Sequence, residues 1–188
     1  NASPEIRSQR WKSLGVWWVL LGTLTTALLV GKIGLAMLMY VAGLLALREF
    51  NQLYRRQSAD ASRLASTVAL LGLGHYAWLV LVQTQWLLLA FPMFVWVAIG
   101  TVQVLHGESR GFLRATGGYS WASVLFFWGL SHIVALSSLP VTSDSPGSSW
   151  LAVGPMGWPL FVILLTQCDD IAQALIGRRF GRHKMIPS

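Results

Sequence analysis

The chain has 188 residues, of which 54% are hydrophobic and only 11% are charged. A soluble domain carries about a quarter charged residues, so this chain has too few to cover a surface that faces water. The composition predicts an all-α, polytopic integral membrane protein. The net charge of +7 does not indicate a nucleic-acid partner, because the basic residues are spread over short loops. Anionic membrane lipids are the expected partners of such charges.

Six apolar stretches follow one another along the chain, each near the roughly 20 residues that a helix needs to cross the hydrocarbon core. They are residues 14–31, 33–50, 65–84, 86–105, 119–139 and 150–168. We therefore expect a cytoplasmic N-terminal segment, a four-helix membrane region, a cytoplasmic linker, and a last region with helices five and six and a polar tail motif. The bounds of these four regions are 1–13, 14–105, 106–118 and 119–188.

The basic residues are distributed unevenly between the two sides that six spans define. Thirteen of the fourteen Lys and Arg residues lie in the N-terminal segment, in two alternate loops with their flanks, and in the tail; Lys32 is on the other side. Short cytoplasmic loops are enriched in Lys and Arg. Both the N-terminus and the C-terminal tail are therefore predicted to be cytoplasmic, in a protein of the cytoplasmic (inner) membrane.

Few polar residues interrupt the spans. His75 and His132 are expected to form hydrogen bonds between helices, because no H-x-x-x-H or H-E-x-x-H spacing supports a metal site. Cys168 is the single cysteine, so an intrachain disulfide is excluded. We expect it to be a small packing residue beside the sixth span.

The tail, "CDDIAQALIGRRFGRHKMIPS", combines acid, glycine and base directly after an apolar span. If the last helix continues into it, Asp170, Gly177 and Gly181 share one face, together with Gln173 or Ala174. Carboxylates hold Mg²⁺, and Arg and Lys neutralise phosphoryl oxygens. The tail is thus either a basic flank that sets membrane topology or a site where a metal–triphosphate meets a lipid phosphate.

The tail also resembles the central motif of the phosphatidate cytidylyltransferases, or CDP-diacylglycerol synthases. That motif reads roughly Asn-Asp-x-x-Ala-Tyr-x-x-Gly-[Arg/Lys]-x-x-Gly-[Arg/Lys]-x-Lys and continues with a Ser-Pro element. The matching residues are Asp170, Gly177, Arg178, Gly181, Arg182, Lys184 and Ser188. The sequence departs from the motif where Asp169 replaces Asn and where Gln173-Ala174 replaces Ala-Tyr. "ALREF" at 46–50 resembles a Leu-x-Glu-aromatic motif that closes an early helix in the family.

The resemblance implies CTP-dependent cytidylyl transfer to phosphatidic acid, which gives CDP-diacylglycerol and pyrophosphate, with Mg²⁺ or another divalent cation. It assigns catalytic roles to Asp170 and Lys184, and metal binding to Asp170 with Asp169. Nucleotide and phosphate binding falls to Gly177, Arg178, Gly181, Arg182 and Ser188. Family members continue beyond this motif with further aspartates, so we expect activity to need sequence beyond residue 188, a second copy, or a second polypeptide. The alternatives are a non-catalytic membrane scaffold, a transporter subunit, or half of a split enzyme.

Overall fold

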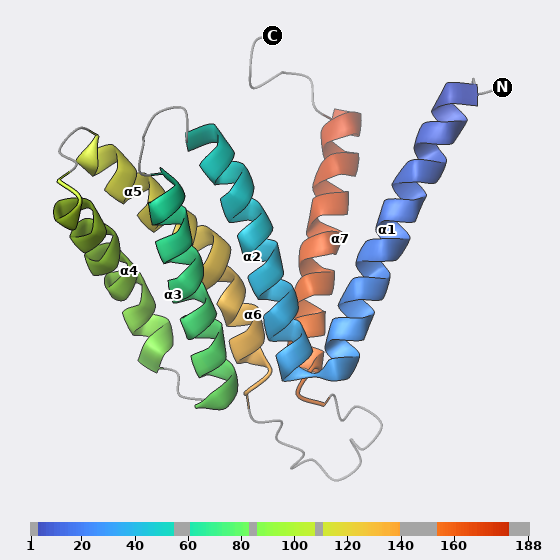
Figure 1. The fold of residues 1–188 in the computed structure, drawn as a ribbon. Helices are drawn as coiled ribbons and strands as arrows, with labels where there is room; N and C mark the ends of the chain where they lie inside the picture. The colour runs from blue at the N-terminus through green and yellow to red at the C-terminus, as the bar shows by residue number, and fades with distance from the viewer. Residues whose placement is uncertain (1–3, 55–60, 83–85, 108–110, 140–153, 181–188) are drawn as a thin grey trace.

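A computed structural model describes residues 4–54, 61–82, 86–107, 111–139 and 154–180, and every regular element in these ranges is helical (Figure 1). The helices are α1 (Pro4–Val30), α2 (Lys32–Tyr54), α3 (Ala61–Leu81), α4 (Trp86–Leu105), α5 (Phe112–Ser123), the π-helical turn η1 (Val124–Gly129), α6 (Leu130–Leu136) and α7 (Gly157–Phe180). α5, η1 and α6 run on without a break, so they form one long helix with a wide turn in its middle.

Five helical stretches are long and apolar enough to cross a membrane, which confirms the predicted all-α, polytopic membrane fold. They are Lys32–Tyr54, Ala61–Leu81, Trp86–Leu105, Phe112–Leu136 and Gly157–Gly177, and the apolar part of α1, Leu14–Val30, is shorter. The beginning of α1 and the end of α7 lie at the same end of the molecule (Figure 1). Which side of the membrane this end faces stays a prediction.

The fifth membrane helix begins at Phe112 and not at residue 119, so it takes in part of the segment we expected to be a linker. Burial explains the difference, because Ala115 and Tyr119 are almost fully buried against the bundle. The Tyr119 hydroxyl bridges two other helices: it lies 2.6 Å from Asn51 Oδ1 and 2.8 Å from the Ala61 carbonyl oxygen. Packing of this face therefore outweighs the low helix propensity of the two glycines in the segment.

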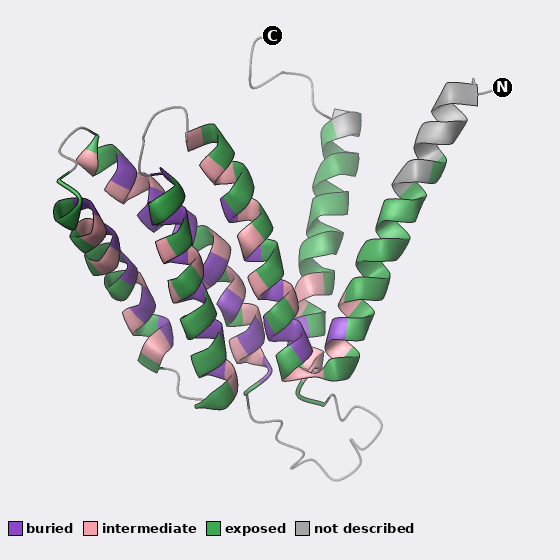
Figure 2. Ribbon diagram, in the orientation of Figure 1, coloured by how far each residue is buried: buried purple, intermediate pink, exposed green. Residues whose placement is uncertain are grey.

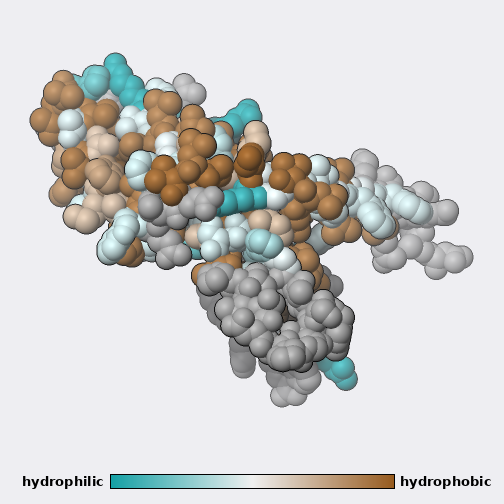
Figure 3. Space-filling view, turned by 90° about the horizontal axis from the view of Figure 1, so that it is seen from below, coloured by the Kyte–Doolittle hydropathy of each residue, from teal (hydrophilic) through white to brown (hydrophobic). Residues whose placement is uncertain are grey.

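The buried residues belong mainly to α2, α3, α4 and the long helix α5–η1–α6, whereas α1 and α7 expose most of their described surface (Figure 2). In the end-on view of Figure 3, apolar residues dominate the described surface of the bundle. Exposed large side chains include Trp18, Leu29, Leu89 and Leu113. Such a surface is unfavourable in water and suits a hydrocarbon solvent.

The π turn η1 packs against two glycines. The ring of Phe127 is fully buried, and a Cβ atom added at Gly72 would lie 2.6 Å from it. A Cβ added at Gly43 would lie 2.5 Å from the carbonyl oxygen of Phe126 and 3.1 Å from the Phe127 ring. These glycines therefore form a notch on α2 and α3, which we call the glycine notch, and only residues without a side chain leave room there for the π turn.

Side chains of neighbouring helices also bind the π turn. The Tyr76 hydroxyl on α3 donates to the Phe127 carbonyl oxygen at 3.2 Å, and the Trp128 indole N–H donates to the Leu88 carbonyl oxygen on α4. A π turn disturbs the regular helical hydrogen-bond pattern, and in a bilayer no water replaces a lost bond. Partners on α3 and α4 thus help to stabilise a wide turn that is rare in isolated helices.

Candidate active site on helix α7

Helix α7 carries the described part of the tail motif. It runs from Gly157 to Phe180, so the expected continuation of the last span into the motif is confirmed. Pro159 lies in its first turn, where a missing N–H costs nothing. Pro159 is fully buried and Ile163 packs against the core. Every residue from Leu164 to Gly177 is exposed. The motif therefore lies on a helix that is attached to the bundle near its beginning.

The two carboxylates have different surroundings. The Gln173 side-chain amide donates to Asp169 Oδ2 at 2.7 Å, one helical turn away. Asp170 is exposed and makes no hydrogen bond or ion pair with any described residue. Neighbouring residues on a helix point about 100° apart, so the two carboxylates do not converge. Gln173 thus binds one oxygen of Asp169, whereas both oxygens of Asp170 are without a partner among the described residues.

The glycine and the arginines follow on the same helix. A Cβ atom added at Gly177 would meet no atom within 4 Å, so no described part of the chain needs this glycine for packing. Arg179 is exposed in the last turn, and Arg178 precedes it. The predicted site residues Gly181, Arg182, Lys184 and Ser188 lie outside the described residues. The described part of the motif is thus an acid–glycine–arginine series along one helix.

The two carboxylates of α7 could hold Mg²⁺ only together with other ligands such as substrate phosphates and water. Among the described residues no group of three or more His, Cys, Asp or Glu side chains could hold a metal ion. Mg²⁺, however, is commonly bound by one or two carboxylates together with substrate phosphates and water. Asp170 has no partner among the residues that the structure describes, and it fits that role. If a metal were held there, it would neutralise negative charge on substrate phosphates.

The polar residues inside the spans have structural partners. His75 is buried, and its Nε2 lies 2.9 Å from Ser131 Oγ on α6, which confirms the expected bond between helices. For His132 the expectation was wrong, because its Nδ1 bonds the Trp128 carbonyl oxygen of its own chain segment at 2.8 Å and the residue is exposed. Cys168 is exposed on α7 and is not a packing residue.

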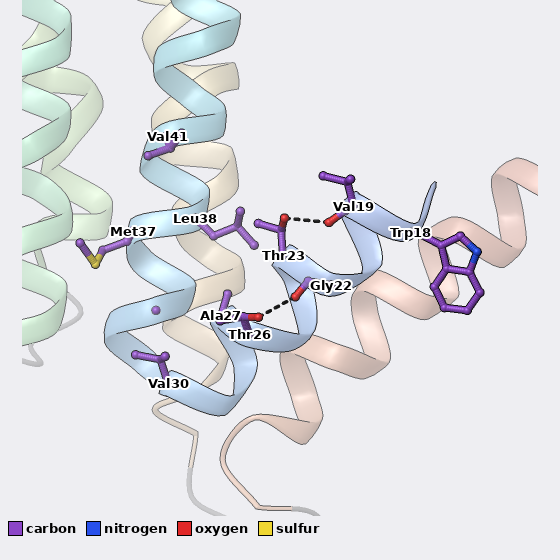
Figure 4. Close-up of a pocket in the computed structure, with 11 residues that line it drawn as sticks. Trp18, Val19, Gly22, Thr23, Thr26, Ala27, Val30, Met37, Leu38 and Val41 are labelled. Atoms are coloured by element: carbon purple, nitrogen blue, oxygen red, sulfur yellow. Dashed lines mark hydrogen bonds between the residues drawn. The ribbon is translucent and has the colours of Figure 1, made fainter. Parts of the chain in front are cut away.

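An apolar groove of about 690 Å³ lies between α1 and α2 (Figure 4). Its two drawn threonine hydroxyls donate within α1, Thr23 to the Val19 carbonyl oxygen and Thr26 to that of Gly22. No charged side chain lines the groove. It offers apolar contact alone, so phosphate chemistry is left to the tail motif.

The roles of Tyr76, Tyr119 and the glycine notch could not be read from the sequence. Tyrosine and glycine are ordinary residues in membrane helices. The hydroxyls of Tyr76 and Tyr119 each bond a backbone carbonyl that lies more than 50 positions away in the chain. The one available signal was a glycine, Gly43 or Gly72, in the middle of an otherwise bulky apolar span. A glycine there suggests close packing but does not name the neighbour.

Comparison with known proteins identifies the class of protein. The Cytidylyltransferase family matches residues 11–188, so the chain belongs to this family, and the resemblance seen in the tail is confirmed. Over 100 residues the chain is 34% identical to the uncharacterized protein YnbB of Escherichia coli (strain K12). That stretch covers 53% of this chain and 31% of YnbB, less than a third of the relative's length. No solved structure matches the chain.

Proposed function

We propose that this chain takes part in CTP-dependent cytidylyl transfer to phosphatidic acid, giving CDP-diacylglycerol and pyrophosphate. A phosphate oxygen of the lipid forms a bond to the α-phosphorus of CTP while the bond from that phosphorus to the bridging oxygen breaks, and pyrophosphate leaves with its electron pair. The lipid phosphate is ionised near neutral pH, so the attack needs no strong base. Positioning and charge neutralisation supply most of the catalysis of such transfers.

The observation that carries this proposal is the pattern on α7, within a chain that belongs to the Cytidylyltransferase family. Asp170 is the carboxylate left free for Mg²⁺, whereas Asp169 is bonded to Gln173. Gly177 leaves open space on the helix, where a nucleotide can approach the backbone. The arginines and Lys184 provide positive charge for the phosphates. We place this end of the molecule on the cytoplasmic side, where CTP is available.

The adjacent aspartates provide a matched pair of variants. In the full-length protein, Asp170→Asn should reduce CDP-diacylglycerol formation from labelled CTP and phosphatidic acid by at least about 100-fold, because it removes a ligand charge at the metal. Asp169→Asn should retain most of the activity, because Asn can still accept the Gln173 bond and is the residue that the resembling motif carries. Equal activity in wild type and Asp170→Asn would refute the site. A full-length protein without any product would favour the non-catalytic scaffold.

Substitution of Gly177 distinguishes a role of this glycine in substrate binding from a role in folding. Alanine fits there without a clash and favours a helix over glycine, so Gly177→Ala should not lower the stability and should raise it by up to about 1 kcal/mol. If the nucleotide lies against this face, the same variant should raise the KM for CTP several-fold. An unchanged KM would mean that the glycine does not border the nucleotide, while the role of Asp170 would still stand on its own test.

We also propose that groups from outside the described residues complete the site, because α7 exposes residues 164–177 and its two carboxylates do not converge. A second copy of the chain is one source. Cys168 tests it directly, since it is exposed beside the aspartates. Oxidative cross-linking in membranes should give a disulfide-linked dimer if two α7 helices face each other. A chain that stays monomeric under oxidation would point to a different polypeptide region as the source.

A further inference from the structure

Among the described residues, helix α7 packs on the bundle near its beginning and is exposed beyond Ile163, so we call it a lever: a small tilt at the beginning displaces the far end. Its beginning is fixed by buried Pro159 and by Ile163, which packs against the core. The motif lies beyond this attachment: at 1.5 Å per residue, Asp170 is about 10 Å and Gly177 about 21 Å further along the axis. A tilt of about 10° at the attachment would therefore move Gly177 by about 4 Å. Small changes at the beginning of α7 are thus enlarged at the motif.

The neighbour that α7 mainly contacts is α6, which follows directly after the π turn. A π turn contains one residue more than an α turn. If η1 closed to an α-helical turn, α6 would rotate by about 100° relative to α5, since each residue of an α-helix turns by that amount. The π turn therefore decides which face of α6 is presented to the beginning of α7.

Besides the bond from the Trp128 indole N–H to Leu88 on α4, groups on α2 and α3 hold the π turn in place. The Tyr76 hydroxyl bonds the Phe127 carbonyl oxygen, a backbone group inside the turn, at 3.2 Å. On the other side, the Phe126 carbonyl oxygen lies so close to Gly43 that a Cβ atom there would be 2.5 Å away. The Phe127 ring fills the space between Gly43 and Gly72. The Tyr76 hydroxyl and the glycine notch thus fix this wide turn on the side of α2 and α3, and the Trp128–Leu88 bond holds it on the side of α4.

We propose that Tyr76 is a positioning residue for the α7 motif, acting through η1 and α6 and not through contact with substrate. Its consequence for activity rests on the proposed cytidylyl transfer, but its effect on the position of α7 does not. Tyr40 provides a matched control. Its ring packs against those of Tyr76 and Phe127, both at 5.8 Å between centroids, and Tyr40→Phe keeps this ring. Its hydroxyl donates to the Ala69 carbonyl oxygen at 3.1 Å and makes no hydrogen bond to the π turn, so Tyr40→Phe removes a hydroxyl from the same cluster without removing a bond to the turn.

The 188 residues contain one cysteine, Cys168, which is exposed on α7. A nitroxide on Cys168 and a second on Leu53→Cys, an exposed position of α2, report the distance between α7 and the bundle by electron spin resonance in lipid nanodiscs. Tyr76→Phe should shift the centre of this distance distribution by more than about 2 Å or clearly broaden it, given the lever length. Tyr40→Phe should reproduce the wild-type distribution. Thermal unfolding of both variants checks that they are equally stable.

Gly43→Ala provides a second, independent perturbation of the π turn and should shift the same distance, even if Tyr76→Phe fails to fold. Equal distances in wild type and in each folded variant would overturn the proposal, as would equal shifts in Tyr76→Phe and Tyr40→Phe. If the full-length wild type forms CDP-diacylglycerol, Tyr76→Phe should lower kcat more than tenfold with little change in the KM for CTP. If the wild type forms none, the proposed function fails, while the distance measurement still decides the role of Tyr76.

Discussion

The glycine notch predicts opposite effects for two alanine substitutions on the same helix. At Gly72 the new Cβ would lie 2.6, 2.8 and 3.0 Å from three ring atoms of Phe127, whereas at Gly74 it would meet nothing within 4 Å. Alanine favours a helix over glycine by about 1 kcal/mol at either position. At Gly72 this gain is opposed by overpacking, which costs about 1–3 kcal/mol when a buried ring cannot move away. The Phe127 ring is fully buried, so it has no such freedom.

We therefore expect Gly72→Ala to be less stable than Gly74→Ala by about 1–3 kcal/mol. A difference of about 2 kcal/mol corresponds to roughly 4–8 °C in Tm for a chain of this size. The assay is thermal unfolding in detergent followed by circular dichroism, with both variants purified in the same way. Gly72→Ala combined with Phe127→Leu should recover part of the loss, because the smaller side chain makes room for the methyl group. Equal stability of the two alanine variants would refute the notch.

Two further substitutions test the buried polar groups by the same unfolding measurement. Tyr119→Phe should lower the stability by about 1–3 kcal/mol, because it removes the hydroxyl that bridges Asn51 and Ala61 and leaves a buried carbonyl with one bond fewer; a loss below about 0.5 kcal/mol would contradict the bridge. His75→Phe should stay within about 1 kcal/mol of wild type, because it loses one bond but also removes Nδ1, a buried nitrogen without a partner among the described residues. Ser131 would still donate to the Trp128 carbonyl oxygen, so a loss above about 2 kcal/mol would show that the imidazole has a further role.

The membrane helices could be predicted from the sequence because their signal is local. Runs of apolar residues near the thickness of a bilayer identify spans without reference to any neighbour. The continuation of α7 through the motif was predicted for the same reason, since no glycine or proline interrupts residues 164–176. The start of α5 at Phe112 was missed, because what makes that segment helical is burial against other helices.

The candidate site could be predicted only as residues, not as an arrangement. The acid–glycine–base spacing singled out Asp170 and Gly177 as candidates. The i,i+4 spacing allows the bond between Asp169 and Gln173, but only the structure shows that it forms while Asp170 bonds no described residue. The π turn could not be predicted from the sequence at all. Its stability depends on Tyr76, Gly43 and Gly72, which come from two other helices. Contacts between distant segments override local preference at such places.

The π turn is synthesised after the groups that hold it. The groups that hold it, on α2, α3 and α4, precede it in the chain, so they leave the ribosome first. When residues 124–129 enter the membrane, their partners are already in place to receive them. In a circular permutant that made this span before α2, α3 and α4, the wide turn would have none of these partners when it entered the membrane, and we expect the regular α-helix to be favoured there instead.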